Sequence, residues 1–413
     1  MQAIGIIAEY NPFHNGHRWH LDQSRAISGQ DLVIAVMSGH FVQRGEPAAF
    51  DKWTRAEMAV SAGVDLVLEL PAVFAVRSAE YFATGGIRLL QSLGVVDRVA
   101  FGAENADLEV LSAIADAVDD PITIEYLKLG LESGETYAKA LGRALARKSG
   151  AAAAVIAAPN NILAIEYIRA IRRFAPRLCP LPIPRRGVGH HEADITGPIA
   201  SATAIRQALA DKTIDQEAIC AAMPAFSASS IKSAMVSGRG PVFFADFDQM
   251  LLAKLRSMPL ADLADLPDVN EGLQNKIKAA ALQVTTARDL LSNIKSKRYS
   301  HTRLQRILIH ALLGCSQSRL RDFDATGPLY ARVLAFSDRG RTLLRQLSRT
   351  SDIPVITKTT RFLNSSQRDS HSLTPLQAML AVDTLATDLY MLAMPNPQER
   401  LGGGDFRTSP RYL

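Results

Sequence analysis

Two histidines flank a glycine near the start of the chain, in the segment His14-Asn15-Gly16-His17. An apolar run at residues 3–8 precedes them and a helix can follow, so they would lie at a strand–turn–helix junction. The first N–H groups of a helix lack partners and the dipole is positive there, which favours a phosphate. Two imidazoles at this position can donate hydrogen bonds to phosphate oxygens whose charge grows during attack at phosphorus. The spacing therefore predicts a nucleotide site with His14 and His17 as catalytic residues.

A purely structural role is the plain alternative, because histidines near a helix start can be caps or surface groups. Two features favour the nucleotide site. Gly16 lets the backbone approach a phosphate, and Pro12 stiffens the chain before the turn. The turn also follows the first strand of an apparent α/β domain, where open parallel sheets bind nucleotides. The pattern resembles the nucleotidyltransferase superfamily, whose members activate a substrate by attack on the α-phosphate of ATP.

Zinc binding is a rival interpretation, because His14, His17 and His20 are spaced three residues apart. Only His17 and His20 fall securely in one helix, no Cys or Glu completes the set, and phosphate chemistry accounts for the glycine. We therefore expect no metal held by protein side chains. ATP is expected as a substrate, with Mg²⁺ carried by its phosphates.

The first half of the chain alternates apolar strands with helices. The expected elements are strands at residues 3–8, 31–37, 65–70, 98–101 and, at the sheet edge, 181–184, and helices at residues 52–62 and 79–93, with Asp51 and Ser78 as N-caps. Continuous apolar strands separated by helices are typical of a parallel sheet covered on both faces. We predict an α/β fold, with a doubly wound, Rossmann-like nucleotidyltransferase domain at residues 1–225.

The second half has fewer strand signals and an uneven charge. Apolar residues recur at helical spacing in residues 250–255, 304–313, 329–334 and 376–391, which predicts an α-rich domain at residues 226–413. Residues 291–361 hold fourteen Lys or Arg against four Asp, and the rest of the chain has more acidic than basic residues. A local basic surplus favours a polyanion such as nucleic acid, although a solvated helical face is the plain alternative.

The composition is that of an ordinary globular protein with two or three domains. No apolar run reaches membrane-spanning length, and no secretory signal is visible at the N-terminus. Cys179, Cys220 and Cys315 are widely spaced and form no metal or redox motif. We expect a cytoplasmic protein without a membrane or protein partner.

Polar groups follow several of the predicted strands. The loop at residues 38–47 carries Arg44, which can bind pyrophosphate or a substrate carboxylate, or simply be an exposed turn residue. Gly102 ends the strand at residues 98–101 and permits close approach of an adenosine. An amide cap is expected from Asn160 or Asn161, where the next helix begins.

A second phosphate motif is predicted at the end of this half, in residues 200–206. Hydroxyls and N–H groups at a helix start, together with Arg206, can hold a phosphate. The segment resembles the second superfamily signature, Ile-Ser-Ser-Thr-x-Ile-Arg: Ala200 and Ala202 depart from it, and the matching residues are Ser201, Thr203, Ile205 and Arg206.

A basic segment at residues 297–306 combines cations with an aromatic residue. Arg303 and Arg306 lie three residues apart on one helical face, and Tyr299 can stack on a splayed base. The alternative is a basic helix with a buried tyrosine. The surrounding surplus of positive charge favours RNA, with contacts expected from Arg298, Tyr299, Arg303 and Arg306.

Four segments together resemble the tRNA(Met) cytidine acetate ligase family: residues 9–17, 37–47, 159–163 and 297–306. The resemblance implies a ligase that forms acetyl adenylate from acetate and ATP and acetylates N4 of the wobble cytidine of elongator tRNA(Met). It also implies ATP contacts from Ile7, Ala8, Glu9, Tyr10, Asn11, Pro12, Phe13, His14, Asn15, Gly16, His17, Arg18, Trp19, His20, Gly102, Asn161, Arg185 and Arg186.

Two other functions fit parts of the pattern. An adenylyltransferase acting on a small phosphorylated metabolite would use the same first motif, but it would not need the basic helical half. A non-catalytic RNA-binding module with a vestigial nucleotide fold is opposed by the intact His14, His17 and Arg206.

Overall fold

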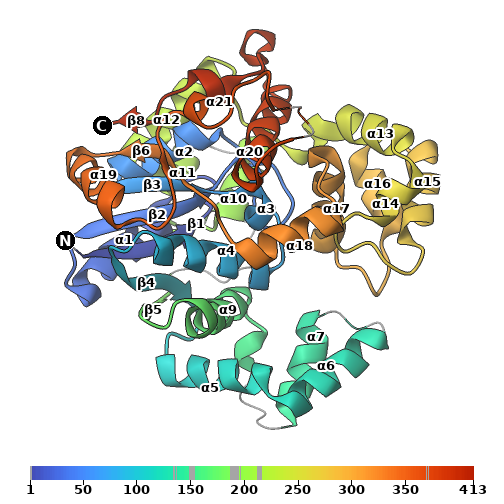
Figure 1. Ribbon diagram of the computed structural model, residues 1–413, viewed down its shortest axis with the longest axis horizontal. Helices are drawn as coiled ribbons and strands as arrows, with labels where there is room; N and C mark the ends of the chain where they lie inside the picture. The colour runs from blue at the N-terminus through green and yellow to red at the C-terminus, as the bar shows by residue number, and fades with distance from the viewer. Residues whose placement is uncertain are drawn as a thin grey trace.

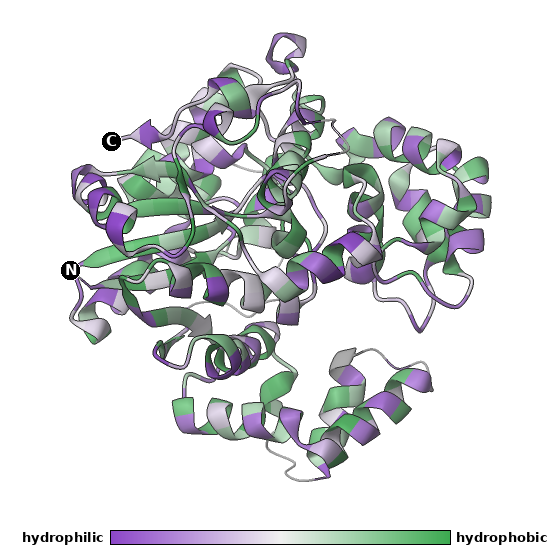
Figure 2. Cartoon of the chain, in the orientation of Figure 1, coloured by the Kyte–Doolittle hydropathy of each residue, from purple (hydrophilic) through white to green (hydrophobic). Residues whose placement is uncertain are grey.

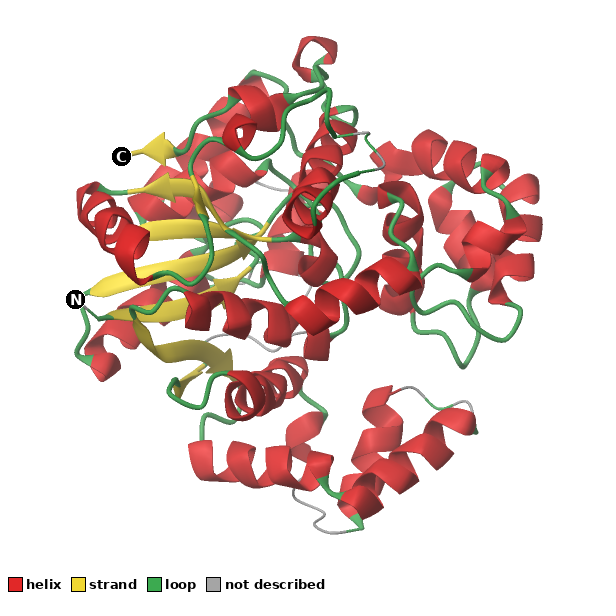
Figure 3. Ribbon diagram, viewed as in Figure 1, coloured by secondary structure: helices red, strands yellow, loops and turns green. Residues whose placement is uncertain are grey.

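An eight-stranded mixed sheet forms the centre of the larger part of the molecule (Figures 1 and 3). The structure is a computed structural model that describes residues 2–133, 135, 137–147, 154–186, 195, 197–211, 216–368, 370 and 372–413. Its strands are β1 (Ala3–Ala8), β2 (Leu32–Ser38), β3 (Leu66–Leu70), β4 (Val96–Ala103), β5 (Cys179–Pro184), β6 (Ala331–Phe336), β7 (Val355–Ile356) and β8 (Arg411–Tyr412).

The strand order confirms the predicted doubly wound α/β fold. The order is β5-β4-β1-β2-β3-β6-β7, with β8 paired to β6, and β1 to β5 run parallel to one another. The chain moves from β1 outward through β2 and β3, then returns to the other side of β1 with β4. A crevice opens where the direction reverses, at the carboxyl ends of β1 and β4, and such a switch point is where this kind of sheet binds ligands.

Both faces of the sheet are buried, as the continuous apolar strands predict. On β1, Ile4 and Ile6 belong to one core cluster, while Ala3 and Ile7 belong to another. Successive side chains of a strand point to opposite faces, so the two clusters lie on opposite sides of the sheet. Figure 2 shows the strands as predominantly hydrophobic and the surrounding helices as mixed.

The helices of the first half begin close to the predicted positions. Asp51 caps α2, accepting a 2.9 Å hydrogen bond from Thr54 N, whereas Ser78 precedes α4 without a side-chain cap. β5 lies at the predicted sheet edge. Among the described residues, no helix has the length and apolarity needed to cross a membrane. The helices are α1 (Asn15–Ser28), α2 (Lys52–Ser61), α3 (Ala72–Ala75), α4 (Ala79–Ser92), α5 (Leu108–Asp119), α6 (Pro121–Glu132), α7 (Tyr137–Ala146), α9 (Pro159–Phe174), α10 (Ala202–Ala210), α11 (Gln216–Ala221) and α12 (Ala225–Val236).

The second half is rich in helices, as predicted, but it also returns to the sheet. Residues 250–255, 304–313 and 376–391 are helical, whereas the predicted helix at residues 329–334 is wrong, because this segment enters β6, antiparallel to β3. The division at residue 225 stays a prediction. The helical elements are η1 (Phe244–Phe247), α13 (Asp248–Ser257), α14 (Leu260–Ala264), α15 (Leu273–Gln283), α16 (Ala287–Ile294), α17 (His301–Leu313), α18 (Gln317–Thr326), α19 (Asp338–Thr350), η2 (Thr359–Arg361), α20 (Pro375–Met391), η3 (Pro397–Glu399) and α21 (Gly404–Arg407).

A buried group of four charges joins the two halves. Lys52 Nζ lies 2.8 Å from Glu69 and 2.9 Å from Asp405, and Arg332 lies 3.1 Å and 2.7 Å from the same two carboxylates. Burial alone would raise the pKa of Asp405, but Arg332 and Lys52 lower it far below its usual value. Two positive and two negative charges balance, so removing one of them would cost about 3–5 kcal/mol.

Candidate active site

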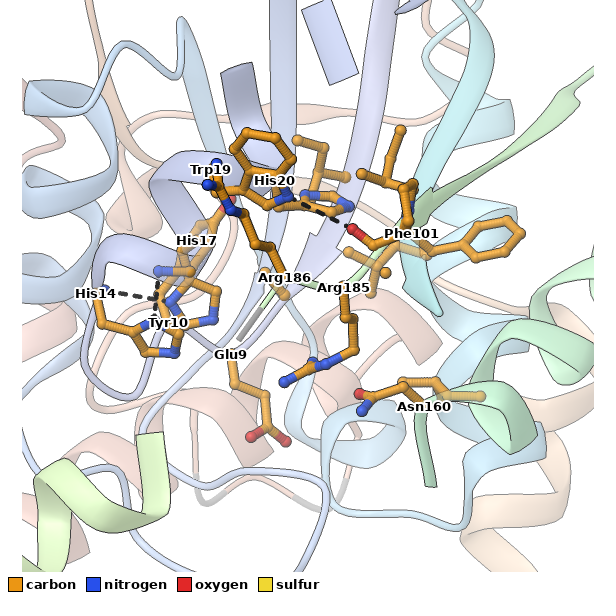
Figure 4. A pocket seen from close by; sticks show the side chains of 18 of the residues that line it. Glu9, Tyr10, His14, His17, Trp19, His20, Phe101, Asn160, Arg185 and Arg186 are labelled. Atoms are coloured by element: carbon orange, nitrogen blue, oxygen red, sulfur yellow. Dashed lines mark hydrogen bonds between the residues drawn. The ribbon is translucent and has the colours of Figure 1, made fainter. Parts of the chain in front are cut away.

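A cavity of about 170 Å³ opens at the carboxyl ends of β1, β4 and β5, at the predicted switch point (Figure 4). We call it the histidine pocket. Its walls come from β1 and the turn after it, from α1, from β4, from α9 and from the end of β5. The lining residues are Ile6, Ile7, Ala8, Glu9, Tyr10, His14, Gly16, His17, Trp19, His20, Phe101, Gly102, Asn160, Leu163, Tyr167, Ile183, Pro184, Arg185 and Arg186.

His14 and His17 form a reciprocal cap at the start of α1. His14 Nδ1 accepts a 3.0 Å hydrogen bond from Gly16 N, and His17 Nδ1 accepts one of 3.3 Å from His14 N. The ring centroids are 3.8 Å apart. Because each Nδ1 is an acceptor, a neutral ring carries its proton on Nε2. The caps therefore fix both tautomers and leave two Nε2–H donors.

Both rings are neutral at neutral pH. Burial, together with the smaller effect of the positive charges of Arg185 and Arg206, lowers the pKa of His14 to about 3. Burial, followed by its histidine neighbours, also lowers the pKa of His17 well below its ordinary value. These histidines thus offer hydrogen bonds without a net charge, while the helix terminus and the arginines supply positive potential.

The second phosphate motif lies against the first. Ser201 caps α10, accepting a 3.0 Å hydrogen bond from Ala204 N. Arg206 donates to Asn11 O at 2.9 Å, and Thr203 Oγ1 lies 3.4 Å from the same guanidinium. The two motifs are therefore neighbours in space, although the second-motif residues Ser201, Thr203 and Arg206 do not line the histidine pocket.

The loop at residues 38–47 supports the pocket from the β2 side. Gln43 N donates a 2.9 Å hydrogen bond to the Glu9 carboxylate, and burial raises the pKa of Glu9. Arg55 donates to the Glu9 carbonyl at 2.6 Å. Arg44 makes no hydrogen bond or ion pair with any described residue, and its charge lies near Glu9 and Arg206.

The start of α9 differs from the prediction. Ala158 is the N-cap and makes no side-chain cap, so the expected asparagine cap is wrong. Glu104 performs that role from the end of β4, because its carboxylate accepts from Asn161 N at 3.1 Å and from Asn160 Nδ2 at 2.6 Å. Asn160 consequently lines the pocket, and Asn161 instead binds Asn105 N and the Val155 carbonyl.

The structure brings most of the expected ATP-contact residues into one pocket but leaves six outside it. Phe13 is fully buried in the core, and Arg18 is exposed and paired with Asp22. Arg186 lies with its guanidinium 4.9 Å from the Trp19 ring. The six outside are Asn11, Pro12, Phe13, Asn15, Arg18 and Asn161, and the lining residues that the sequence did not suggest are Ile6, Phe101, Asn160, Leu163, Tyr167, Ile183 and Pro184.

The four expected RNA contacts meet at a second cavity, of about 350 Å³, which we call the arginine cavity. It is lined by Leu131, Glu132, Glu135, Asn270, Glu271, Arg298, Tyr299, Ser300, Arg303 and Arg306. The Tyr299 side chain is held in place: the residue is 8% exposed, its hydroxyl binds Asn270, and Arg303 lies 4.8 Å from the ring. Stacking on a base would require the ring to leave this position.

No group of three or more His, Cys, Asp or Glu side chains is placed to hold a metal ion in the described part of the chain. The histidine Nδ1 atoms are also engaged by backbone N–H groups. The pocket thus offers hydrogen-bond donors and cations, which suit phosphate oxygens.

This combination of fold and pocket is that of a nucleotidyl transferase, and the HIGH Nucleotidyl Transferase family model matches residues 1–405. The chain is 43% identical to a tRNA(Met) cytidine acetate ligase of Caldanaerobacter subterraneus over 96% of each chain, and 40% identical to that of Acetivibrio thermocellus over 98% of each. Two crystal structures of Thermotoga maritima TmcAL, one apo and one bound with alpha-thio ATP, give TM-scores of 0.93 and 0.91 at 31% identity, covering 100% of both chains. The chain belongs to the tRNA(Met) cytidine acetate ligase family.

Proposed function

We propose that this chain forms acetyl adenylate from acetate and ATP and transfers the acetyl group to N4 of the wobble cytidine of elongator tRNA(Met). The main support from the structure is the pair of fixed Nε2–H donors at the start of α1, inside the histidine pocket. Further support comes from relatives named for this activity and from the similar T. maritima structure with alpha-thio ATP. Because tRNA is its substrate, the cytoplasm is the proposed site of action.

In the first step an acetate oxygen attacks the α-phosphorus of ATP. The new O–P bond forms as the bond to pyrophosphate breaks, and negative charge builds on the phosphate oxygens. We assign His14 and His17 to donate Nε2–H hydrogen bonds to these oxygens, supported by the positive end of the α1 dipole. Catalysis would then rest on positioning and electrostatic stabilisation.

The remaining ATP contacts are proposed from the shape of the pocket. Gly102 lies at the β4 end of the pocket, where a Cβ would first meet Arg185 at 3.5 Å, so the backbone there is open to an adenosine. Arg185 and Arg186 enter from the end of β5, and Arg206 reaches the first motif through Asn11. Mg²⁺ would enter on the ATP phosphates, because the described residues supply no cluster of ligands for it.

In the second step the cytidine amine attacks the carbonyl carbon of acetyl adenylate. The C–N bond forms, AMP leaves with the electrons of the C–O bond, and the amine loses one proton. A single-stranded anticodon base can be turned out of its stack at little cost. Arg298, Tyr299, Arg303 and Arg306 are proposed to contact the RNA.

ATP–pyrophosphate exchange separates the possible functions. Exchange that depends on acetate, followed by labelled N4-acetylcytidine at the wobble position when tRNA(Met) is added, is the expected result. Exchange that depends on a phosphorylated metabolite instead would indicate an adenylyltransferase. The absence of exchange with either compound would contradict a catalytic role.

A further inference from the structure

Arg306 is a buried cation without a partner. The residue is 8% exposed, it makes no hydrogen bond or ion pair with any described residue, and its buried Nε has no acceptor. Its side chain lines the arginine cavity. A buried charge is normally paired, because its lost hydration must be replaced. Arg306 is therefore available to pair with an anion that enters the cavity.

The neighbouring cations strengthen this conclusion. Arg303 lies one turn before Arg306, and its buried Nε also has no acceptor. Its terminal nitrogen donates to the Asp268 carbonyl at 2.7 Å, which fixes the guanidinium beside the cavity. Arg77 is the other nearby cation, but it is already paired with Asp324 at 2.9 Å. Two guanidinium groups thus face one cavity with donors unused.

The charge of Asp268 favours the ionised form of Arg306, but its carboxylate forms no ion pair with it. The acidic residues that line the cavity form none with it either. Glu271 is paired with Arg298, and Glu135 lies 3.1 Å from Arg143. Glu132 is exposed to solvent, and it makes no ion pair with Arg306. The unused positive charge therefore lies on the α17 wall.

The backbone of Arg306 is held rigidly by the loop at residues 38–47. Gly45, with φ +78°, lies so close to the Arg306 backbone that no Cβ would fit there. Gln305 donates to Glu46 at 3.1 Å, next to this contact. This contact fixes the backbone position from which the Arg306 guanidinium is presented, and a guanidinium can bind a phosphate through two parallel hydrogen bonds.

We propose that the arginine cavity binds one phosphate group between Arg306 and Arg303. A phosphodiester of the RNA backbone and a free phosphate ion share this chemistry. The RNA source rests on the proposed function, whereas phosphate binding by itself does not. The RNA source is consistent with the position of the cavity, because the loop that touches Arg306 also holds Glu9 of the histidine pocket through Gln43.

The first test is thermal melting of the full chain in sodium phosphate and in sodium chloride at equal ionic strength. We expect phosphate to raise the melting temperature of the wild type and of Arg345→Met, and to raise that of Arg306→Met clearly less. Arg345 is an exposed helical arginine of α19, and Met retains most of the aliphatic length of Arg. His14→Ala is included because the histidine pocket can also bind phosphate, and it should keep the shift.

Two results of this test would overturn the proposal. One is an undiminished phosphate shift in Arg306→Met. The other is a melting temperature of Arg306→Met far below that of Arg345→Met in chloride, because an arginine without structural partners should not be needed for folding.

The second test measures binding of a tRNA(Met) anticodon stem-loop over a range of salt concentrations. If the phosphate belongs to the RNA, Arg306→Met should reduce the slope of log affinity against log salt by about 1, relative to Arg345→Met. Loss of the phosphate shift with an unchanged RNA slope would assign the site to free phosphate and reject the RNA source. Acetate-dependent exchange, measured without RNA, tests the proposed function separately.

Discussion

The hydrogen-bond donors of the histidine pocket are neutral, whereas those of the arginine cavity are charged. In the histidine pocket, burial keeps His14 and His17 neutral, and their caps leave the Nε2–H of each as a donor. In the arginine cavity, Arg303 and Arg306 keep permanent charges with unused donors. Neutral donors act at short range on charge that develops during a reaction, whereas fixed charges attract a polyanion at longer range and are screened by salt. The difference fits the roles proposed for the two sites, catalysis in the histidine pocket and RNA binding in the arginine cavity.

The strongest test of this comparison removes the neutral donors. His14→Ala and His17→Ala should each lower acetate-dependent ATP–pyrophosphate exchange by about 10²–10³-fold, because a stabilising hydrogen bond to the transition state is lost. Arg18→Ala is a matched control in the same helix, since Arg18 lies outside the pocket and pairs with Asp22 on the surface. Near-normal exchange in either histidine variant would refute the catalytic assignment. Melting temperatures are needed alongside, because loss of the His14 cap costs about 1 kcal/mol.

Reversing the fixed charges should mainly affect RNA. Arg303→Glu with Arg306→Glu should weaken binding of tRNA(Met) on the order of a hundredfold, because attraction to phosphate becomes repulsion. Exchange without RNA should fall far less. The measurements are filter binding and pyrophosphate exchange on the same preparations, with Arg345→Glu as the control. Equal losses in both assays would indicate a folding defect.

The neutral His14 ring should also make the free energy of unfolding depend on pH. The pKa of His14 is about 3 in the folded chain and near 6.5 when unfolded, so the unfolded chain takes up the proton first as the pH falls. The stability that the neutral ring provides is complete above pH 6.5 and declines below it. The difference in unfolding free energy between wild type and His14→Ala should therefore shrink by about 2 kcal/mol from pH 7 to pH 5. Urea unfolding measures this, and the difference between wild type and Arg306→Met should stay constant.

The smallest expected effect is that of salt concentration, which should weaken RNA binding more than it changes pyrophosphate exchange. With one phosphate bound at the arginine cavity, raising the salt concentration about fourfold should weaken the RNA binding that this cavity provides about threefold. Exchange measured without RNA should change less over the same range. RNA affinity that is independent of salt would contradict a role for fixed charges.

The sequence predicts the part of the histidine pocket that is built by β1, the turn after it and the start of α1. The strand, the turn and the start of α1 are contiguous, so His14, Gly16 and His17 are brought together by local structure alone. Asn160 and Tyr167 come from α9, and helical spacing does not tell which end of a helix faces a distant pocket. Pro184 could have been predicted as a lining residue, because a predicted parallel strand ends there and such strand ends meet at the crevice.

β6 shows where hydrophobic periodicity fails to predict secondary structure. Its residues Ala331 to Ala335 are all buried, so the alternation that marks a half-exposed strand is missing. Apart from Arg332 the strand is apolar, and a short buried run of this kind cannot be distinguished from a buried helix by spacing. Its partner β3 lies far away in the sequence, and no local signal announces that pairing.

That pairing has a consequence for the chain as it is synthesised. β3 leaves the ribosome long before β6, so the nascent sheet ends in an apolar strand with unpaired backbone groups, and Lys52 and Glu69 still lack Arg332 and Asp405. An open edge of this kind recruits strands from other molecules. Premature termination would therefore yield an aggregating product, and the N-terminal half cannot serve as a free-standing module.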